Sequence, residues 1–163
     1  MPLSYYDAQD VVYNALRADS TLYNMLASGQ GSIYIAGKMT PKDMDESENV
    51  RRLAATPAKA LAVTVEWAGE KELSGSTHLS EQSVIIRIHD RPIGTAYNIK
   101  RVRERIKTVI YSLTTHPSTA SKGFLNINMI STTGIDYDIM LATAYEALLF
   151  KFMVSNHSAD GRI

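Results

Sequence analysis

The chain has 163 residues, and its seventeen Lys and Arg balance seventeen Asp and Glu, so no global field favours a polyanion such as DNA. Hydrophobic residues make up 45% of the chain, which is enough for the core of one compact domain. Because the chain has no cysteine, disulfide bonds, cysteine-ligated zinc and thiol nucleophiles are excluded. No run approaches the roughly 20 apolar residues of a membrane span and the N-terminus shows no leader pattern, so we expect a soluble, unexported protein.

The N-terminal region predicts two short helices followed by a strand. Ser4 and Asp7 have the spacing of a capping box, which indicates the start of the first helix. Asp19 offers a cap for the second helix. The segment SIYIA, residues 32–36, then alternates polar and apolar residues as a strand does. The apolar residues of the two helices that we expect to face the core are Val12, Leu16, Leu22, Met25 and Leu26.

The periodicity disappears over residues 38–57, which contain two prolines and a run of acidic residues. This composition predicts a long surface loop. A loop of this length inside a small domain is either mobile or functional, so both a partner contact and a plain solvated loop stay open as interpretations.

Two strands come next and predict an antiparallel hairpin. The segment ALAVTVEWAG, residues 60–69, alternates strongly and places Trp67 on its apolar side, so we expect Trp67 in the core. The segment SVIIRIHD, residues 83–90, alternates in the same way. The polar excursion between them, residues 69–80, is too long for a tight turn and is either a protruding contact or a flexible loop.

The most informative element is a long helix from Thr95 to Leu113, which contains the basic run KRVRERIK at residues 100–107. Its apolar residues fall within one arc of a helical wheel, and we expect that arc to be buried. They are Ile99, Val102, Ile106, Val109, Ile110 and Leu113.

The cations of this helix divide into two flanks around the apolar arc. Lys100, Arg103 and Lys107 lie on one flank, and Arg101 and Arg105 lie on the other. A helix that follows a phosphate backbone concentrates its cations on one ridge, so this division favours a solvated face over a DNA contact.

Two further strands are expected to close the chain. The segment FLNINMIS, residues 124–131, alternates as a strand, and residues 132–141 are expected to link it to the last element. Residues 144–155 suit a strand by alternation and a helix by local propensity, and we choose the strand. Residues 156–163 are expected to be a frayed tail.

No arrangement of residues indicates an enzyme, a cofactor or a metal site. His89 and Asp90 resemble a base and its orienting acid, but strand neighbours point to opposite faces, which favours a structural histidine. Asp136 and Asp138 share one side of Tyr137, yet two ligands without a third are weak evidence for a metal, and we interpret the segment as a solvated turn. The histidines lack metal-ligand spacing, and no serine lies in a nucleophile motif.

The elements predict one α+β domain spanning residues 1–163. Its mixed or antiparallel sheet has about four to five strands, and the N-terminal helices and the long amphipathic helix pack on it.

This order of elements resembles the tail-terminator, or tail-completion, proteins of long-tailed bacteriophages. The resemblance rests on DAQDVVYNALRADSTLYNML with SIYIA, on SVIIRIHDRPIGTAYNIKRVRERIKTVIYSL as strand then helix, and on YEALLFKFMVS as the last strand. It covers most of the chain and involves patterns rather than signature residues. The chain departs from the smaller members of the family in its longer loop at residues 38–57 and its excursion at residues 69–80.

The resemblance implies a structural virion protein without catalytic activity, assembled in the host cytoplasm into a hexameric ring at the head-proximal end of the tail. Such a ring stops polymerisation of the tail tube, meets the head-completion proteins, and lets DNA pass through its lumen as cargo. The alternatives are another phage neck or tail adaptor and, third, a nucleic-acid-binding module. The candidate acidic residues for a lumen or partner loop are Asp43, Asp45, Glu46 and Glu48. The candidate subunit contacts are Arg101, Arg105, Glu70 and Glu72.

Overall fold

The computed structural model describes the chain in seven segments, which are residues 8–27, 29–35, 61–73, 79–90, 96–114, 124–138 and 143–155. The helices are α1 (Ala8–Ala18), α2 (Ser20–Tyr23), the short 3₁₀ helix η1 (Gly29–Ser32) and α4 (Ala96–Tyr111). The strands are β1 (Ile33–Ile35), β2 (Ala62–Glu72), β3 (Leu79–Asp90), β4 (Asn126–Asp138) and β5 (Thr143–Ser155).

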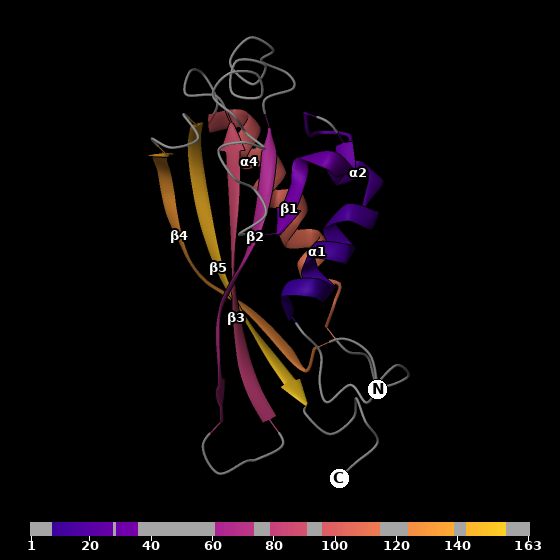
Figure 1. Ribbon diagram of the computed structural model, residues 1–163, viewed down its shortest axis with the longest axis vertical. Helices are drawn as coiled ribbons and strands as arrows, with labels where there is room; N and C mark the ends of the chain where they lie inside the picture. Colours follow the sequence, from indigo (N-terminus) through magenta and orange to yellow (C-terminus); the bar gives the residue numbers. More distant parts are fainter. Residues whose placement is uncertain are drawn as a thin grey trace.

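The five strands form a single mixed sheet in the order β1-β2-β3-β5-β4 (Figure 1). The short β1 pairs parallel to β2, and the other neighbours pair antiparallel. The predicted α+β class, the hairpin of β2 and β3 and the choice of a strand for the last element are therefore confirmed. In this order β1 and β4 are the two edges of the sheet.

The helices cover one face of the sheet, and the core lies between them. Alternate residues of β3, including Val84, Ile86 and Ile88, are fully buried on that face. The apolar arc of α4 packs against them, as predicted, and only Leu113 at its end is partly exposed. Each large apolar side chain buried in this way stabilises the fold by roughly 1.5–3 kcal/mol. The arc of α4 is thus the main helical contribution to the core.

A buried glutamine connects α1 to the sheet. The side-chain oxygen Oε1 of Gln82 on β3 accepts a hydrogen bond of 2.6 Å from the backbone N–H of Ala8. That N–H belongs to the first turn of α1, where backbone donors have no partner within the helix. The amide of Gln82 also donates to Glu70 of β2 at 3.3 Å, and Ser80 donates to the same carboxylate at 2.7 Å. Gln82 therefore ties the start of α1 to the β2–β3 hairpin.

The hairpin is longer than the sequence predicted. Residues 69–72 and 79–80 belong to β2 and β3, so the expected excursion at residues 69–80 is wrong for them, and residues 74–78 lie outside the described part of the chain. The pairing continues through a bulge between Trp67 and Gly69, which shifts the register by one residue, and Gly69 has the positive φ of 115° that a glycine tolerates. In Figure 1 the two strands extend beyond the end of α1.

Trp67 is 39% exposed, so the prediction that it belongs to the core is wrong. The edge strand β1 pairs only with Val63, Thr64 and Val65 of β2. Among the described residues, no strand pairs with this edge of β2 beyond Val65, where Trp67 lies.

The strand β4 is also longer than predicted. Residues 132–138 continue it, so the expected link at residues 132–141 is wrong for that part, and residues 139–141 lie outside the described part. Two irregularities, between Met129 and Ser131 and between Thr132 and Ile135, let the strand stay paired with β5 along its length. The turn residues that suggested a link are accommodated by these bulges.

Other predictions fall on residues that the structure does not describe. These are the capping box at Ser4 and Asp7, the loop at residues 38–57 and the tail at residues 156–163. Within the described segments, no helix combines the length and the apolar character needed to cross a membrane.

Replacing Gln82 by Met is expected to lower the free energy of unfolding by about 2 kcal/mol, because the buried N–H of Ala8 loses its acceptor while the volume of the side chain is kept. Chemical denaturation followed by circular dichroism measures this change. Ser83→Ala, on the other face of the same strand, is the control and should stay within about 0.5 kcal/mol of the parent chain. Equal stability of Gln82→Met and the parent would contradict this account of the link between α1 and the sheet.

Candidate functional site

The outer surface of α4 is held by ion pairs on both of its flanks. Arg103 donates to Glu146 of β5, with an Nη1 to Oε2 distance of 3.0 Å, and the Glu146 side chain is only 4% exposed. On the other flank Arg105 donates to both carboxylate oxygens of Asp19, at 3.0 and 2.7 Å. The expectation that these cations form a merely solvated face is therefore wrong for Arg103 and Arg105, which fasten α4 to β5 and to the start of α2.

Asp19 has two structural tasks. Its carboxylate accepts a hydrogen bond of 2.7 Å from the backbone N–H of Leu22, so it caps α2 as the sequence predicted. The same carboxylate receives the guanidinium of Arg105. The hydrogen bonds from Arg105 and from the Leu22 amide hold the pKa of Asp19 below its ordinary value, although partial burial acts in the opposite direction.

Two cations of the basic run differ from the others. Lys107 lies 3.7 Å from Glu104, which also accepts a hydrogen bond from Arg103. Within the described segments Lys100 and Arg101 form no ion pair. Arg101 instead lies over the ring of Tyr97, 5.7 Å from its centroid, and Tyr97 is 71% exposed. The N-terminal half of α4 therefore presents positive charge and an aromatic ring to solvent.

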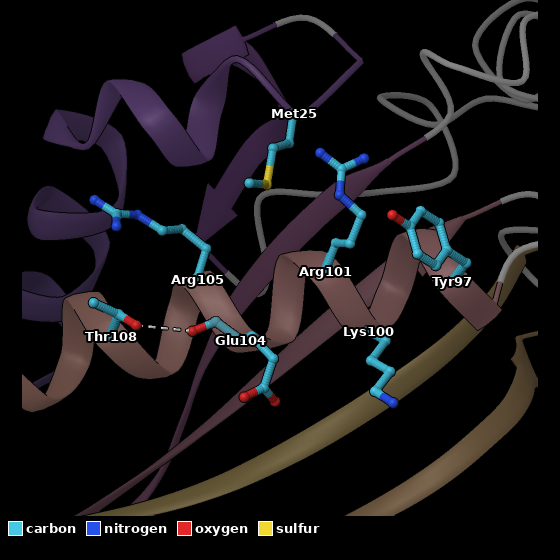
Figure 2. Close-up of a pocket in the computed structure, with 7 residues that line it drawn as sticks. All are labelled: Met25, Tyr97, Lys100, Arg101, Glu104, Arg105 and Thr108. Atoms are coloured by element: carbon cyan, nitrogen blue, oxygen red, sulfur yellow. Dashed lines mark hydrogen bonds between the residues drawn. The ribbon is translucent and has the colours of Figure 1, made fainter.

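A groove of about 510 Å³ runs along this part of α4, beside the segment that follows α2. In Figure 2 Met25 points toward α4 between Arg101 and Arg105, and the ring of Tyr97 lies beside Arg101. The lining residues are Met25, Tyr97, Lys100, Arg101, Glu104, Arg105 and Thr108. A thioether, an aromatic ring and the methylene stems of the arginines give the groove apolar walls.

The lining residues of this groove differ in how far they are engaged within the chain. Thr108, the only lining hydroxyl on an aliphatic side chain, donates to the backbone carbonyl of Glu104 at 3.1 Å. Arg105 is engaged by Asp19, which leaves Arg101 and Lys100 as the charges available to a partner.

The structure does not bring the four predicted subunit contacts together. Arg101 and Arg105 line the α4 groove, whereas Glu70 and Glu72 lie near the end of the β2–β3 hairpin. The carboxylate of Glu70 accepts hydrogen bonds within the hairpin, and Glu72 is exposed. Residue spacing did not reveal that Arg105 pairs with Asp19, or that Glu70 accepts hydrogen bonds from Ser80 and Gln82, because these partners lie ten or more residues apart. The acidic residues proposed for a lumen or partner loop lie outside the described part and are Asp43, Asp45, Glu46 and Glu48.

His89 and Asp90 point to opposite faces of β3 and serve separate neighbours. A ring nitrogen of His89 lies 2.8 Å from the hydroxyl of Thr143, and the ring packs against Tyr145. Asp90 accepts a hydrogen bond of 3.4 Å from Asn98 of α4. The two residues therefore form no catalytic pair, and His89 is a buried structural residue.

The segment around Asp136 belongs to β4, so its interpretation as a solvated turn is wrong. Among the described residues, no group of three or more His, Asp or Glu is placed to hold a metal ion. The same strand presents exposed apolar residues that the sequence reasoning missed, namely Ile130, Ile135 and Tyr137. The alternation of Ile135 and Tyr137 with acids was the signal for this exposed strand, but neighbouring turn residues concealed it.

A search of known protein families and of curated proteins finds no family and no relative that matches this chain. The resemblance in element order therefore stays a prediction. Functional inference for this chain rests on the fold, the α4 groove and the exposed edge at β4.

Replacing Asp19 by Asn is expected to lower the free energy of unfolding at pH 7 by about 1 kcal/mol, because Asn keeps the helix cap and loses the ion pair. Asp19→Ala loses both and is expected to cost about 2 kcal/mol. Denaturant titrations at pH 7 of the parent and the two variants measure these differences.

Acid should remove the contribution of the ion pair. A carboxyl group whose pKa is lowered by folding stabilises the protein above its unfolded pKa, here near 3.8, and this contribution is lost as the pH falls through the folded value. The difference in unfolding free energy between the parent and Asp19→Asn should therefore shrink below pH 4. A difference that stays constant from pH 7 to pH 3 would show that Arg105 does not favour the charged form of Asp19.

Proposed function

We propose that this chain is a structural virion protein, a tail terminator that caps the phage tail tube as a ring, stops its polymerisation and forms the joint to the head-completion proteins. The observation that carries the proposal is the order of elements in the fold. Two N-terminal helices and a short strand precede a hairpin, a long amphipathic helix and two closing strands on one mixed sheet. This is the arrangement that the resemblance to the tail-terminator family implies.

The described surface supports an assembly role. A ring subunit needs two different surfaces, because each copy must contact the next through one and the previous through the other. This chain has an exposed apolar edge at β4 and a groove at α4. The end of the sheet formed by β2, β3 and β5 extends beyond α1 and adds a further surface that can meet the tail tube or a head-completion protein (Figure 1).

The pairing of the basic run favours this role over nucleic-acid binding. Arg103, Arg105 and Lys107 each meet a carboxylate, so only two of the five cations in residues 100–107 lack one in the described part of the chain. Tight binding of a phosphate backbone requires several free cations along one path. DNA is therefore proposed as cargo of the ring lumen, without a dedicated contact on α4, and no cofactor or catalytic activity is proposed.

Tail-tube subunits of the same phage, polymerised with and without this protein, test the proposal. The protein should bind one end of each tube and stop elongation, because a ring that matches the tube end removes the surface on which the next subunits stack. Electron microscopy of tube lengths and of end-bound density measures the effect.

Unlimited tube growth in the presence of the protein, with no density at tube ends, would contradict termination. The salt dependence of duplex DNA binding is the companion measurement. Tight binding whose logarithm falls steeply with the logarithm of salt concentration would favour the nucleic-acid-binding alternative.

A further inference from the structure

The α4 groove has apolar walls and carries two cations that form no ion pair within the described part of the chain. Arg101 lies over Tyr97 and forms no ion pair among the described residues, and Lys100 beside it is exposed. Met25 forms the facing wall. A complementary ligand must carry negative charge next to apolar side chains, because it meets a cation and a thioether within one groove.

The exposed end of β4 carries this combination. Ile135 and Tyr137 are each about half exposed and lie on the same side of the strand, since they are two residues apart. Asp136 lies between them and is exposed on the other side. The backbone N–H of Tyr137 donates to Oδ1 of Asp136 at 2.8 Å, which holds this carboxylate close to the strand. Residues 135–137 thus present two apolar side chains and one carboxylate on a strand whose outer edge pairs with no other described strand.

The groove and the β4 patch, residues 135–137, lie on different flanks of α4: Met25 lines the groove on one flank, whereas Glu146, the β5 partner of Ile135, pairs with Arg103 on the other. Helix α1 contacts β1 and β2, α2 contacts α4, and the groove opens beside the segment after α2. The strand β4 is the other edge of the sheet. Figure 1 shows α1 and α2 at the right of the view and the edge strand β4 at the left. Two different and complementary surfaces on one chain connect copies head to tail.

We propose that the β4 patch of one copy of this chain docks in the α4 groove of the next. A strand edge presents side chains on both of its faces, so Ile135 and Tyr137 meet the Met25 wall of the groove while Asp136 meets the α4 wall. The apolar residues pack on Met25, and the carboxylate pairs with Arg101 beside the ring of Tyr97. This contact rests on the proposed function, for which it supplies the subunit interface of the ring.

Docking of this kind also accounts for an exposed edge. Free sheet edges with apolar side chains attract other strands and lead to aggregation unless they are covered or interrupted. The two bulges of β4 interrupt its edge along the strand, while the exposed apolar residues at its end stay available. The bulges hinder the addition of another strand along β4, whereas the apolar residues at its end stay exposed. This combination favours a side-chain contact with a helix groove over continuous pairing of strands.

A charge exchange tests the contact. Arg101→Glu and Asp136→Lys should each weaken self-association on the order of tenfold, measured by sedimentation over a concentration series, because each places like charges together at the interface. The chain that carries both substitutions should regain association, since the charges attract again with opposite order. Arg101→Glu combined with Asp10→Lys, an equal change of charge at an exposed residue of α1, should gain nothing and is the matched control.

Cross-linking provides a second measurement that does not depend on the strength of association. The chain has no cysteine, so any disulfide arises only from introduced residues. A mixture of Lys100→Cys and Asp136→Cys chains should form the mixed dimer under mild oxidation, and each chain alone should form far less dimer. Asp10→Cys, at an exposed residue of α1, replaces Asp136→Cys in the control mixture. Circular dichroism of each variant confirms that it is folded.

The results separate this contact from the wider proposal. Rings or oligomers that persist unchanged in both single variants, or equal cross-linking in the control mixture, would overturn the β4 contact while a capped tube would still support termination. A parent chain that stays monomeric at every concentration and gives no mixed dimer would also overturn the contact. Recovery in the double variant together with selective cross-linking would establish it, even if tube growth is unaffected.

Discussion

Burial of the apolar arc of α4 against β3 and β5 is the constraint on which the other features depend. Alternate residues of the two central strands, including Ile86, Leu148 and Phe150, are removed from water on the helical face of the sheet. Once the arc is buried, the remaining surface of α4 has no freedom to turn. Its two cationic flanks must then face β5 on one side and α2 on the other.

The flanks show how the same side chains serve stability and recognition. Arg103 meets the buried Glu146, and removal of the arginine would leave a carboxylate without its partner in the interior. Arg105 meets the cap of α2 and thereby holds Met25 near α4. The ion pairs therefore shape the groove, and the charge presented to a partner comes from Arg101 and Lys100 alone among the cations of the run.

Local patterns predicted the elements whose periodicity is strong. The arc of α4, the cap at Asp19 and the alternation of β5 each depend on residues close together in sequence. Predictions were wrong where bulges kept a strand paired through turn-forming residues, as at Gly69 and along residues 132–138. Trp67 was misplaced because alternation places it on the apolar side of β2 but does not show that the packing of that side ends before it: Val63 and Val65 are fully buried, whereas Trp67 is exposed.

The sequence by itself determined the α+β class, the buried side of α4 and the absence of a recognisable catalytic motif, because these follow from side-chain periodicity and residue type. Only the tertiary structure decided which charges are paired. Asp19 and Arg105, or Arg103 and Glu146, are distant in the chain and meet only after the helices pack on the sheet. For the same reason the α4 groove and the β4 patch were not visible in the sequence: the groove forms only when the segment after α2 lies beside α4, and β4 becomes an edge only through the order of strands in the sheet.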